Sequence, residues 1–143
     1  MEKQYDCLRL DQQLCFPLYA CARETIKLYT PFLDQLDLTY TQYIAMLVLW
    51  EKHSVTVKEM GEALYLDSGT LTPLLKKMEA KGLLTRRRSA EDERSLIVTL
   101  TEAGLALRER AVEVPSQMAR CVNLEPEERQ ELCRLLNKLL KER

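Results

Sequence analysis

The stretch from residue 56 to 100 constrains the fold most, because it reads as two short helices followed by two β-prone segments. Thr56 to Glu59 has the form T-x-x-E, which is typical of a capping box at a helix N-terminus. Apolar or small residues then recur at helical spacing, at Val57, Met60, Gly61 and Leu64. Residues 65–69 interrupt this pattern with turn and N-cap residues. We therefore expect an amphipathic helix that ends near residue 64.

A second amphipathic helix is expected directly after this turn. Its apolar stripe consists of Leu71, Leu74, Leu75 and Met78. Gly82 stands where such a helix should stop. Because Gly61 has no side chain, the two helices can approach each other closely. Two helices joined by so short a turn are typical of a helix-turn-helix.

Two β-prone segments follow the second helix. Residues 83–88 form the first, and residues 95–100 alternate well enough for a half-buried strand. The polar residues 89–94 join them as the tip of a hairpin. A helix-turn-helix followed by a β-hairpin is a winged helix. The predicted fold class is therefore mainly α with a small β-hairpin.

The second helix and the hairpin carry the candidate DNA contacts. If the apolar stripe faces the core, the other face and the N-terminal tip carry Ser68, Gly69, Thr70, Thr72, Pro73, Lys76 and Lys77. Small hydroxyls and lysines suit base edges and phosphates in a major groove. The net charge is only −1, but residues 76–88 hold six basic residues against one acid, a local +5 that includes Arg86 and Arg88. Most charge runs are solvated faces; on a recognition helix and wing, this one favours DNA.

The segments before the helix-turn-helix are also helical in pattern. Residues 10–29 have two apolar stripes, one of which runs through Cys15, Tyr19, Ala22, Ile26 and Tyr29. Pro17 fits the first turn of a helix that begins near Cys15, or else kinks a longer helix. Thr30 and Pro31 are expected to start a new helical segment. A capping box at Thr39 to Gln42 and the apolar residues 43–50 predict a buried central helix.

The C-terminal part should contain two further helices. One starts at Thr101 and breaks or bends at Pro115, and Pro126 opens the last. Wide apolar faces at both chain ends need a partner, and a second copy is the natural one. We expect one domain over 1–143, with a winged-helix lobe at about 39–100 and dimerisation helices at about 8–36 and 102–143. A two-fold dimer presents its recognition helices to half-sites ~34 to 36 Å apart, or a multiple of that.

Several classes of protein are disfavoured by simple counts. No apolar run approaches the length of a membrane span, and the N-terminus does not resemble a signal peptide, so a cytoplasmic location is expected. The five cysteines, Cys7, Cys15, Cys21, Cys121 and Cys133, form no C-x-x-C pair, and there is a single histidine. Free thiols and no metal or other cofactor are therefore expected.

Two groups of motifs resemble a known family. Residues 64–76, LYLDSGTLTPLLK, and Asp92-Glu93-Arg94 look like the recognition helix and the D-x-R wing tip of MarR-type transcription regulators. More narrowly, LDQQLCF at 10–16 with LYA at 18–20, and LTYTQY at 38–43, resemble the organic-hydroperoxide-sensing, OhrR-type branch. The resemblance covers nearly the whole chain. Its specific part is the Leu-Cys-Phe segment.

The resemblance implies roles for individual residues. Cys15 matches the cysteine that a hydroperoxide converts to a sulfenic acid, and Tyr29 and Tyr40 match the tyrosines that hydrogen-bond its sulfur. Tyr19, in the same resembling segment as Cys15, is counted with these sensor residues. At the wing, Arg94 is expected to enter the minor groove while Asp92 holds it in place. An arginine suits a narrow A·T-rich groove.

Helix geometry tests this arrangement independently of the family. Cys15 and Tyr29 are separated by roughly 21 Å along a straight helix, too far for contact within one chain. If two copies cross antiparallel near Ala22, Cys15 of one copy meets Tyr29 of the other. We therefore predict a sensor site between subunits. The alternative is that Cys15 is only a small hydrophobic residue, as most cysteines on apolar helices are.

The resemblance also implies two fates for the sulfenic acid. In one subclass it forms a disulfide with a late cysteine of the other subunit, for which Cys121 is the better candidate and Cys133 the weaker. In the other, a low-molecular-weight thiol caps it or it over-oxidises. Cys7 and Cys21 receive no role. Two departures from the branch stand out: Pro17 replaces a common Ala, and Glu125 replaces the usual Ser cap before Pro126.

The resulting hypothesis is a dimeric repressor that binds a pseudo-palindromic double-stranded DNA operator when reduced and releases it when organic hydroperoxide oxidises Cys15. A second hypothesis is a MarR-type repressor that responds to an aromatic or lipophilic ligand in the dimer crevice. A third, from another class, is a thiol peroxidase. No histidine is placed to act as a base beside a cysteine, and an enzyme would leave the basic wing unexplained.

Overall fold

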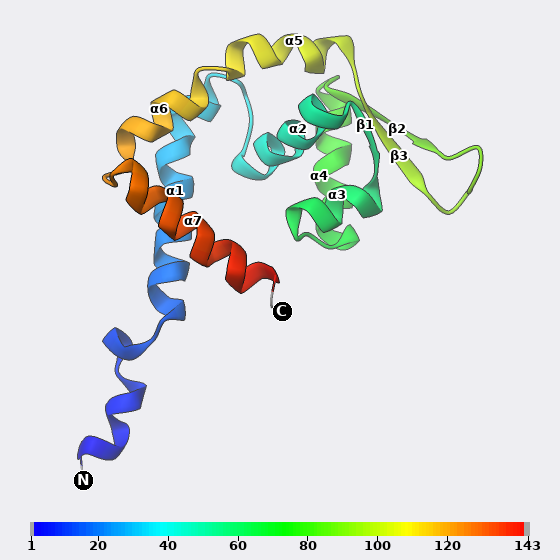
Figure 1. The fold of residues 1–143 in the computed structure, drawn as a ribbon. Coiled ribbons are helices and arrows are strands. Elements are labelled where there is room, and N and C mark those ends of the chain that lie inside the picture. The colour runs from blue at the N-terminus through cyan, green and yellow to red at the C-terminus, as the bar shows by residue number, and fades with distance from the viewer. Residues whose placement is uncertain (1, 142–143) are drawn as a thin grey trace.

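The computed structural model describes residues 2–141 and contains a winged helix flanked by long helices (Figure 1). Two short 3-10 helices, Glu2–Leu8 and Leu10–Gln12, precede the first long helix. The remaining helices are α1 (Cys15–Asp34), α2 (Tyr40–Lys52), α3 (Val57–Leu64), α4 (Ser68–Ala80), α5 (Glu102–Ala111), α6 (Val114–Cys121) and α7 (Pro126–Lys141). The strands are β1 (Ser54–Thr56), β2 (Leu84–Arg88) and β3 (Leu96–Leu100).

Side-chain caps explain where the central helices begin. At α2 the predicted capping box is complete, because Gln42 N–H donates to Thr39 Oγ1 at 3.3 Å and Thr39 N–H donates to Gln42 Oε1 at 3.1 Å. At α3 only half of the predicted box forms, the bond from Glu59 N–H to Thr56 Oγ1 at 3.0 Å. At α4 the N-cap is Asp67, which accepts from Thr70 N–H at 2.7 Å.

The predicted helix-turn-helix is confirmed as α3, a short turn and α4. A Cβ atom on Gly61 would lie 2.6 Å from the backbone oxygen of Leu66, so the absence of a side chain permits the tight turn. Gly82 has a φ of +80° directly after α4, as expected for a glycine that ends a helix. The predicted apolar stripe faces inward, with Leu71, Leu75 and Met78 completely buried.

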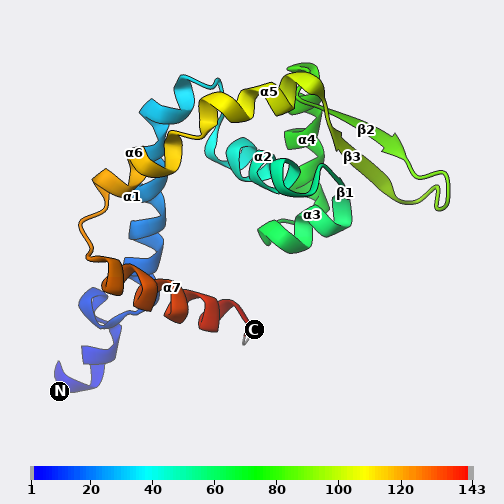
Figure 2. The same cartoon turned by 45° about the horizontal axis from the view of Figure 1, so that its top comes forward.

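The predicted wing is confirmed as the antiparallel hairpin of β2 and β3. Leu84 lies opposite Leu100, and Arg88 lies opposite Leu96. The strand β1 pairs with the other edge of β3, which gives the sheet order β1-β3-β2. This third strand was not predicted. The hairpin extends well beyond the helices of the lobe, as Figures 1 and 2 both show.

The core lies between α2, α3, α4 and the sheet. Its fully buried large side chains include Met46, Leu49, Met60, Leu71, Leu75, Met78, Leu84 and Val98. The prediction of a buried central helix is thus confirmed for α2, although Leu47 on its outer side is 42% exposed. This packing fixes the helix α4 and the base of the wing relative to α2.

The helix α1 is one continuous element, so the predicted start of a new helix at Thr30 and Pro31 is wrong. Pro31 removes one N–H donor from the last turn, where few intrahelical bonds remain to be lost. The next turn holds Leu33, which is 2% exposed, and this burial favours continuation of the helix past the proline. Pro17 lies in the first turn of α1, as one of the two readings predicted.

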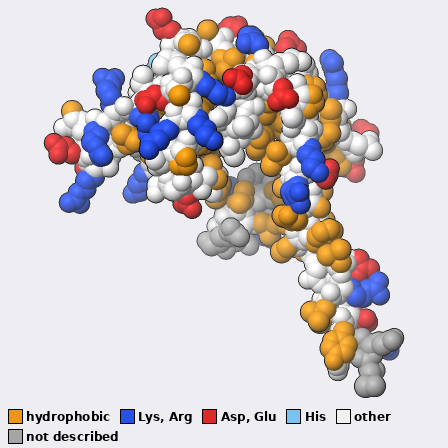
Figure 3. All heavy atoms as spheres, turned by 180° about the vertical axis from the view of Figure 1, so that it is seen from behind, with side chains coloured by type: hydrophobic (Ala, Val, Ile, Leu, Met, Phe, Trp, Pro, Cys, Tyr) orange, Lys and Arg blue, Asp and Glu red, His pale blue; other side chains and the backbone are white. Residues whose placement is uncertain are grey.

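The C-terminal helices pack on different parts of the chain, with α5 on α2 and α6 on α1. The chain breaks between α5 and α6 just before Pro115, and Pro126 is the first residue of α7; both features were predicted. α6 runs beside α1, and the N-terminal 3-10 segment extends beyond the other helices (Figures 1 and 2). Hydrophobic side chains line this extended segment in Figure 3. No helix within residues 2–141 is long and apolar enough to cross a membrane.

Candidate nucleic-acid interface and redox site

The outer face of α4 has the composition expected for reading DNA. Its candidate residues are all exposed: Ser68, Gly69, Thr70, Thr72, Pro73, Lys76 and Lys77. The opposite face of the same helix is buried in the core. The structure therefore brings these residues together on one free surface, and their contact with DNA stays a prediction.

The two candidate arginines of β2 have different surroundings. Arg86 is hydrogen-bonded to Glu79 of α4. Its backbone N–H donates to Glu79 Oε2 at 2.8 Å, and its Nη2 donates to Glu79 Oε1 at 3.1 Å. These bonds hold the pKa of the Glu79 carboxyl below its usual value of 4.5. Arg88 is exposed, and its Nη1 donates to Glu93 O across the wing at 2.9 Å. Arg86 therefore ties β2 to α4, whereas Arg88 faces solvent.

At the wing tip, Asp92 organises the backbone that carries Arg94. Asp92 Oδ1 accepts from Arg94 N–H at 3.0 Å, and Oδ2 accepts from Ser95 Oγ at 3.1 Å. Ser89 Oγ accepts from Asp92 N–H at 3.3 Å on the other side of the tip. Asp92 thus holds the main chain of Arg94 in place. The Arg94 side chain is exposed.

A groove separates the start of the helix-turn-helix from the wing. It has a volume of about 800 Å³ and is lined in part by Lys58, Tyr65, Ser68, Thr72, Arg88 and Arg94. Hydroxyl groups on one wall and cations on both walls are the groups that hold a phosphate backbone. Lys and Arg side chains gather over the wing in the view of Figure 3.

The candidate sensor cysteine begins α1. Cys15 is the first residue of the helix and is exposed. Tyr19, one turn later, is engaged within its own helix: its hydroxyl accepts from Arg23 Nη1 at 3.1 Å, and the Arg23 guanidinium lies 5.5 Å from the ring centroid. Within one chain, Tyr19 therefore interacts with Arg23.

The other two sensor candidates meet at the opposite end of α1. The rings of Tyr29 and Tyr40 lie 5.0 Å apart, and both contact Tyr43, whose ring lies 6.4 Å from Trp50. Burial, with a smaller contribution from Tyr40, raises the pKa of Tyr29, which keeps its hydroxyl a proton donor at neutral pH. One chain thus brings Tyr29 and Tyr40 together but leaves Cys15 at the far end of the helix.

All five cysteines are free and exposed. Cys121 ends α6, where its Sγ donates to Gln117 O at 3.5 Å, and Cys133 lies in the middle of α7. Within residues 2–141 no cluster of three His, Cys, Asp or Glu side chains is arranged to hold a metal ion.

An apolar cavity lies between α1 and α7. It measures about 600 Å³, and its lining includes Leu14, Pro17, Leu18, Tyr40, Leu132 and Leu136. The apolar stripes of α1 and α7 can be recognised in the sequence. That the two stripes line one cavity depends on how the chain between the helices folds.

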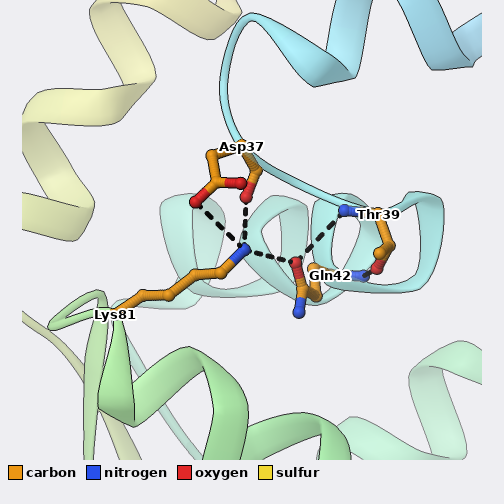
Figure 4. Close-up of polar contacts among 4 residues, drawn as sticks. All are labelled: Asp37, Thr39, Gln42 and Lys81. Carbon is orange, nitrogen blue, oxygen red and sulfur yellow. Dashed lines mark hydrogen bonds and ion pairs between the residues drawn. The ribbon is translucent and has the colours of Figure 1, made fainter.

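Two distant parts of the sequence, residues 37–42 and Lys81, meet at the end of α4. Lys81 contacts Asp37 and Gln42, as Figure 4 shows. Nothing in the sequence pattern indicates this cluster, because Lys81 reads as one more member of the basic run. Together with Arg86, it is a cation that holds the lobe together.

The comparisons with known proteins agree with the fold. Residues 27–110 match the family described as Transcriptional regulator SarA/Rot. The organic hydroperoxide resistance transcriptional regulator of Bacillus subtilis (strain 168) is 59% identical over 115 residues, which cover 80% of this chain and 78% of the relative.

Two solved structures of AbfR, a protein of Staphylococcus epidermidis, are also similar. Reduced AbfR bound to DNA has a TM-score of 0.81 at 34% identity, over 99% of both chains. Disulfide-formed AbfR has a TM-score of 0.66 at 36% identity, over 97% of this chain and 98% of that one.

These relatives are regulators of transcription rather than enzymes, which removes the thiol peroxidase hypothesis. The chain belongs to the SarA- and MarR-type family of winged-helix, DNA-binding transcription regulators, in the branch of the organic hydroperoxide resistance regulators.

Proposed function

We propose that this chain forms a homodimeric repressor that binds a pseudo-palindromic operator in its reduced form and releases it when an organic hydroperoxide oxidises Cys15. The observation that carries the proposal is the division of the sensor residues along α1. Cys15 begins this 20-residue helix, whereas Tyr29 lies near its other end and packs against Tyr40. The rise of an α-helix separates Cys15 and Tyr29 by roughly 21 Å.

A second subunit completes the site. Two copies of α1 that cross antiparallel near Ala22 bring Cys15 of one subunit to Tyr29 and Tyr40 of the other. The exposed apolar residues on α1 and α7 support such a pairing; they include Phe16, Ile26, Leu28, Leu132, Leu135 and Leu139. A two-fold axis makes two identical sensor sites and two recognition helices.

The chemistry at Cys15 is a displacement on the peroxide. The thiolate attacks one peroxide oxygen, the O–O bond breaks, and the leaving alkoxide takes up a proton to become an alcohol. Protonated tyrosine hydroxyls donate hydrogen bonds to the sulfur and stabilise the thiolate, and the raised pKa of Tyr29 fits this role. The sulfenic acid then condenses with a thiol, releasing water. Cys121 of the partner subunit is the first candidate thiol, and Cys133 or a low-molecular-weight thiol is the alternative.

Oxidation weakens DNA binding by moving the two lobes. The operator contacts are the outer face of α4 in the major groove and Arg94 in the minor groove, and both depend on the spacing of the lobes. A new covalent bond at the dimer-facing helix shifts the equilibrium between a binding and a non-binding arrangement. A change of about 3 kcal/mol in binding free energy lowers operator affinity more than 100-fold. The greater similarity to reduced, DNA-bound AbfR than to disulfide-formed AbfR supports a DNA-binding conformation here.

The first test is fluorescence anisotropy with DNA from upstream of the protein's own gene. The reduced protein should bind, one equivalent of an organic hydroperoxide should release the DNA, and a thiol reductant should restore binding. Cys15→Ser should bind and ignore the peroxide. Cys21→Ser is the matched control, because Cys21 is an exposed cysteine on the same helix and should leave the response intact. Release in the Cys15→Ser protein contradicts the proposal.

A mixed dimer tests whether the site lies between subunits. One subunit carries Cys15→Ser and the other carries Tyr29→Phe. If the site is shared between subunits, the remaining Cys15 faces an intact Tyr29 and reacts with peroxide at the wild-type rate. If the site lies within one subunit, that Cys15 faces the phenylalanine and reacts more slowly. Mass spectrometry of the oxidised dimer identifies the resolving thiol.

A second candidate function rests on the apolar cavity of about 600 Å³ between α1 and α7. Such a cavity fits a lipophilic aromatic ligand. In this case 1-naphthoic acid would release operator DNA from the Cys15→Ser protein, whereas no release at millimolar ligand would exclude this function.

A further inference from the structure

The cation at the end of the recognition helix is tied to the turn between α1 and α2 (Figure 4). Lys81 follows the last residue of α4, and its Nζ donates to Gln42 Oε1 at 3.1 Å and to the backbone oxygen of Asp37. The Asp37 carboxylate lies 3.6 Å away. Three acceptors thus surround an ammonium group that has three donors. We refer to Lys81, Asp37 and Gln42 as the Lys81 cluster.

Two of the three acceptors of the Lys81 cluster, the Gln42 amide and the Asp37 main-chain oxygen, are held in place by the fold. Gln42 is only 4% exposed, and its Oε1 also accepts from Thr39 N–H in the capping box of α2. Asp37 has a φ of +54° and stands between two buried leucines, Leu36 and Leu38. A displacement of this turn therefore displaces the ammonium, because its hydrogen bonds go to the buried Gln42 amide and to the main chain of Asp37. The Asp37 carboxylate is 91% exposed and adds little to this connection.

The same turn carries a sensor tyrosine. Tyr40 lies between Asp37 and Gln42 in the sequence, and its ring contacts Tyr29 at 5.0 Å. On the other side, Lys81 is followed by Gly82 and then by the first wing strand, β2. The Lys81 cluster is thus a direct polar connection between the segment that presents Tyr40 and the end of the DNA-reading helix.

We propose that Lys81 is a positioning residue that couples the place of Tyr40 to the orientation of α4. In the reduced protein the Lys81 cluster holds the turn and the recognition helix as one body. When oxidation displaces Tyr40, the turn moves and α4 moves with it. The proposal rests on the proposed function, because it explains how that sensor site acts on the operator-binding surface.

Two other roles for Lys81 must be separated from this one. A lysine in a basic run can contact a DNA phosphate, and a polar cluster can simply stabilise the fold. A phosphate contact makes operator affinity depend more steeply on salt, by roughly 0.9 in the logarithmic slope for each contact. A stabilising role changes the unfolding temperature but leaves the response to oxidation unchanged.

The test measures the ratio of operator dissociation constants after and before treatment with one equivalent of organic hydroperoxide. In Lys81→Met this ratio should fall about tenfold relative to wild type, equivalent to about 1.4 kcal/mol of lost coupling. Lys81→Arg should preserve the ratio, since a guanidinium can donate to the same acceptors. Lys52→Met removes an exposed lysine from the end of α2 as a matched control and should behave as wild type.

Each outcome decides between the roles. An unchanged ratio in Lys81→Met, with or without a lower unfolding temperature, overturns the coupling, and so does a loss of about 0.9 in the salt slope. If Lys81→Met does not fold, Lys81→Gln removes the charge with a shorter polar side chain and carries the same expectation. A wild-type ratio near one overturns the proposed function and the coupling together, whereas a responsive wild type with an equally responsive variant overturns the coupling alone.

Discussion

Replacing Gly61 by alanine should destabilise the helix-turn-helix, against the usual effect of this substitution in a helix. The new Cβ would lie 2.6 Å from the backbone oxygen of Leu66 and 3.3 Å from Leu71 Cδ1. The leucine methyl can move, but the backbone oxygen cannot rotate away. Gly61 O also accepts hydrogen bonds from the N–H groups of Tyr65 and Leu66, so the clash and the turn involve the same peptides.

The size of the effect follows from two opposing contributions. Overpacking against a fixed neighbour costs about 2 to 3 kcal/mol, in the upper part of the usual range. Alanine regains about 1 kcal/mol through its higher helix propensity. The net loss in unfolding free energy is therefore about 1 to 2 kcal/mol. With a urea m-value of about 2 kcal/mol/M, the midpoint should fall by roughly 0.5 to 1 M.

Urea unfolding at a fixed protein concentration measures this effect, followed by the fluorescence of Trp50, the single tryptophan. Gly69→Ala is the matched control. A Cβ at Gly69, in the first turn of α4, would meet only Asp67 Oδ1 at 3.4 Å. This variant should be as stable as wild type or gain up to about 1 kcal/mol. If Gly61→Ala is as stable as Gly69→Ala, the close approach does not limit the substitution, and the reasoning is refuted.

Two further predictions concern the polar contacts of the lobe. Thr39→Ala removes the N-cap of α2 and should lower the unfolding free energy by about 1 kcal/mol. Thr41→Ala leaves this cap in place and removes only an exposed hydroxyl that lies 3.3 Å from Thr39 Oγ1, so it should lower the unfolding free energy by less than Thr39→Ala does; chemical denaturation compares the two. Glu79→Gln removes the carboxylate bound by Arg86. This pairing lowers the pKa of Glu79 in the folded state, so it stabilises the fold above pH 4.5 and the stabilisation is lost as the pH falls through the lowered pKa. The unfolding free energies of wild type and Glu79→Gln should therefore differ most at neutral pH and converge in acid. A difference that grows on acidification would contradict this sign.

Most of the helices and the wing could be predicted from the sequence because the interactions that start and end them lie within a few residues along the chain. Thr39, Thr56 and Gly82 each act on backbone groups within four residues, so their motifs can be read directly from the chain. The wing could be predicted for the same reason, since alternation marks β3 and a polar tip precedes it. The elements that were missed depend on distant partners.

The strand β1 illustrates that limit. It has only three residues, too few for an alternating pattern, and it exists because Val55 lies opposite Val98 on the far edge of β3. Pro31 illustrates another limit. A proline after a threonine is a common helix start, but here the burial of Leu33 keeps α1 continuous. In both cases the structure is determined by packing against distant residues, which the local sequence pattern does not show.

The candidate site shows the same division. The exposed face of α4 follows from the helical period, but the pairing of Tyr29 with Tyr40 requires α1 and α2 to fold against each other. The roles assigned to Cys15 and Cys121 come from the family resemblance alone. The helical rise separates Cys15 from Tyr29 within one chain, and this separation is what led from the sequence to the prediction of a site between subunits.

The distribution of charge over α4 and the wing explains how a protein with a net charge of −1 can bind DNA. Of the six basic residues between 76 and 88, Lys81 and Arg86 are used internally, the first on the α1–α2 turn and the second on Glu79. The exposed cations that remain are Lys76, Lys77, Arg87 and Arg88, joined at the tip by Arg94. A count of charges along the sequence therefore overstates the number of cations that are free to contact DNA. Lys81 and Arg86 bind the parts of the lobe to one another and so help to set where the exposed cations lie.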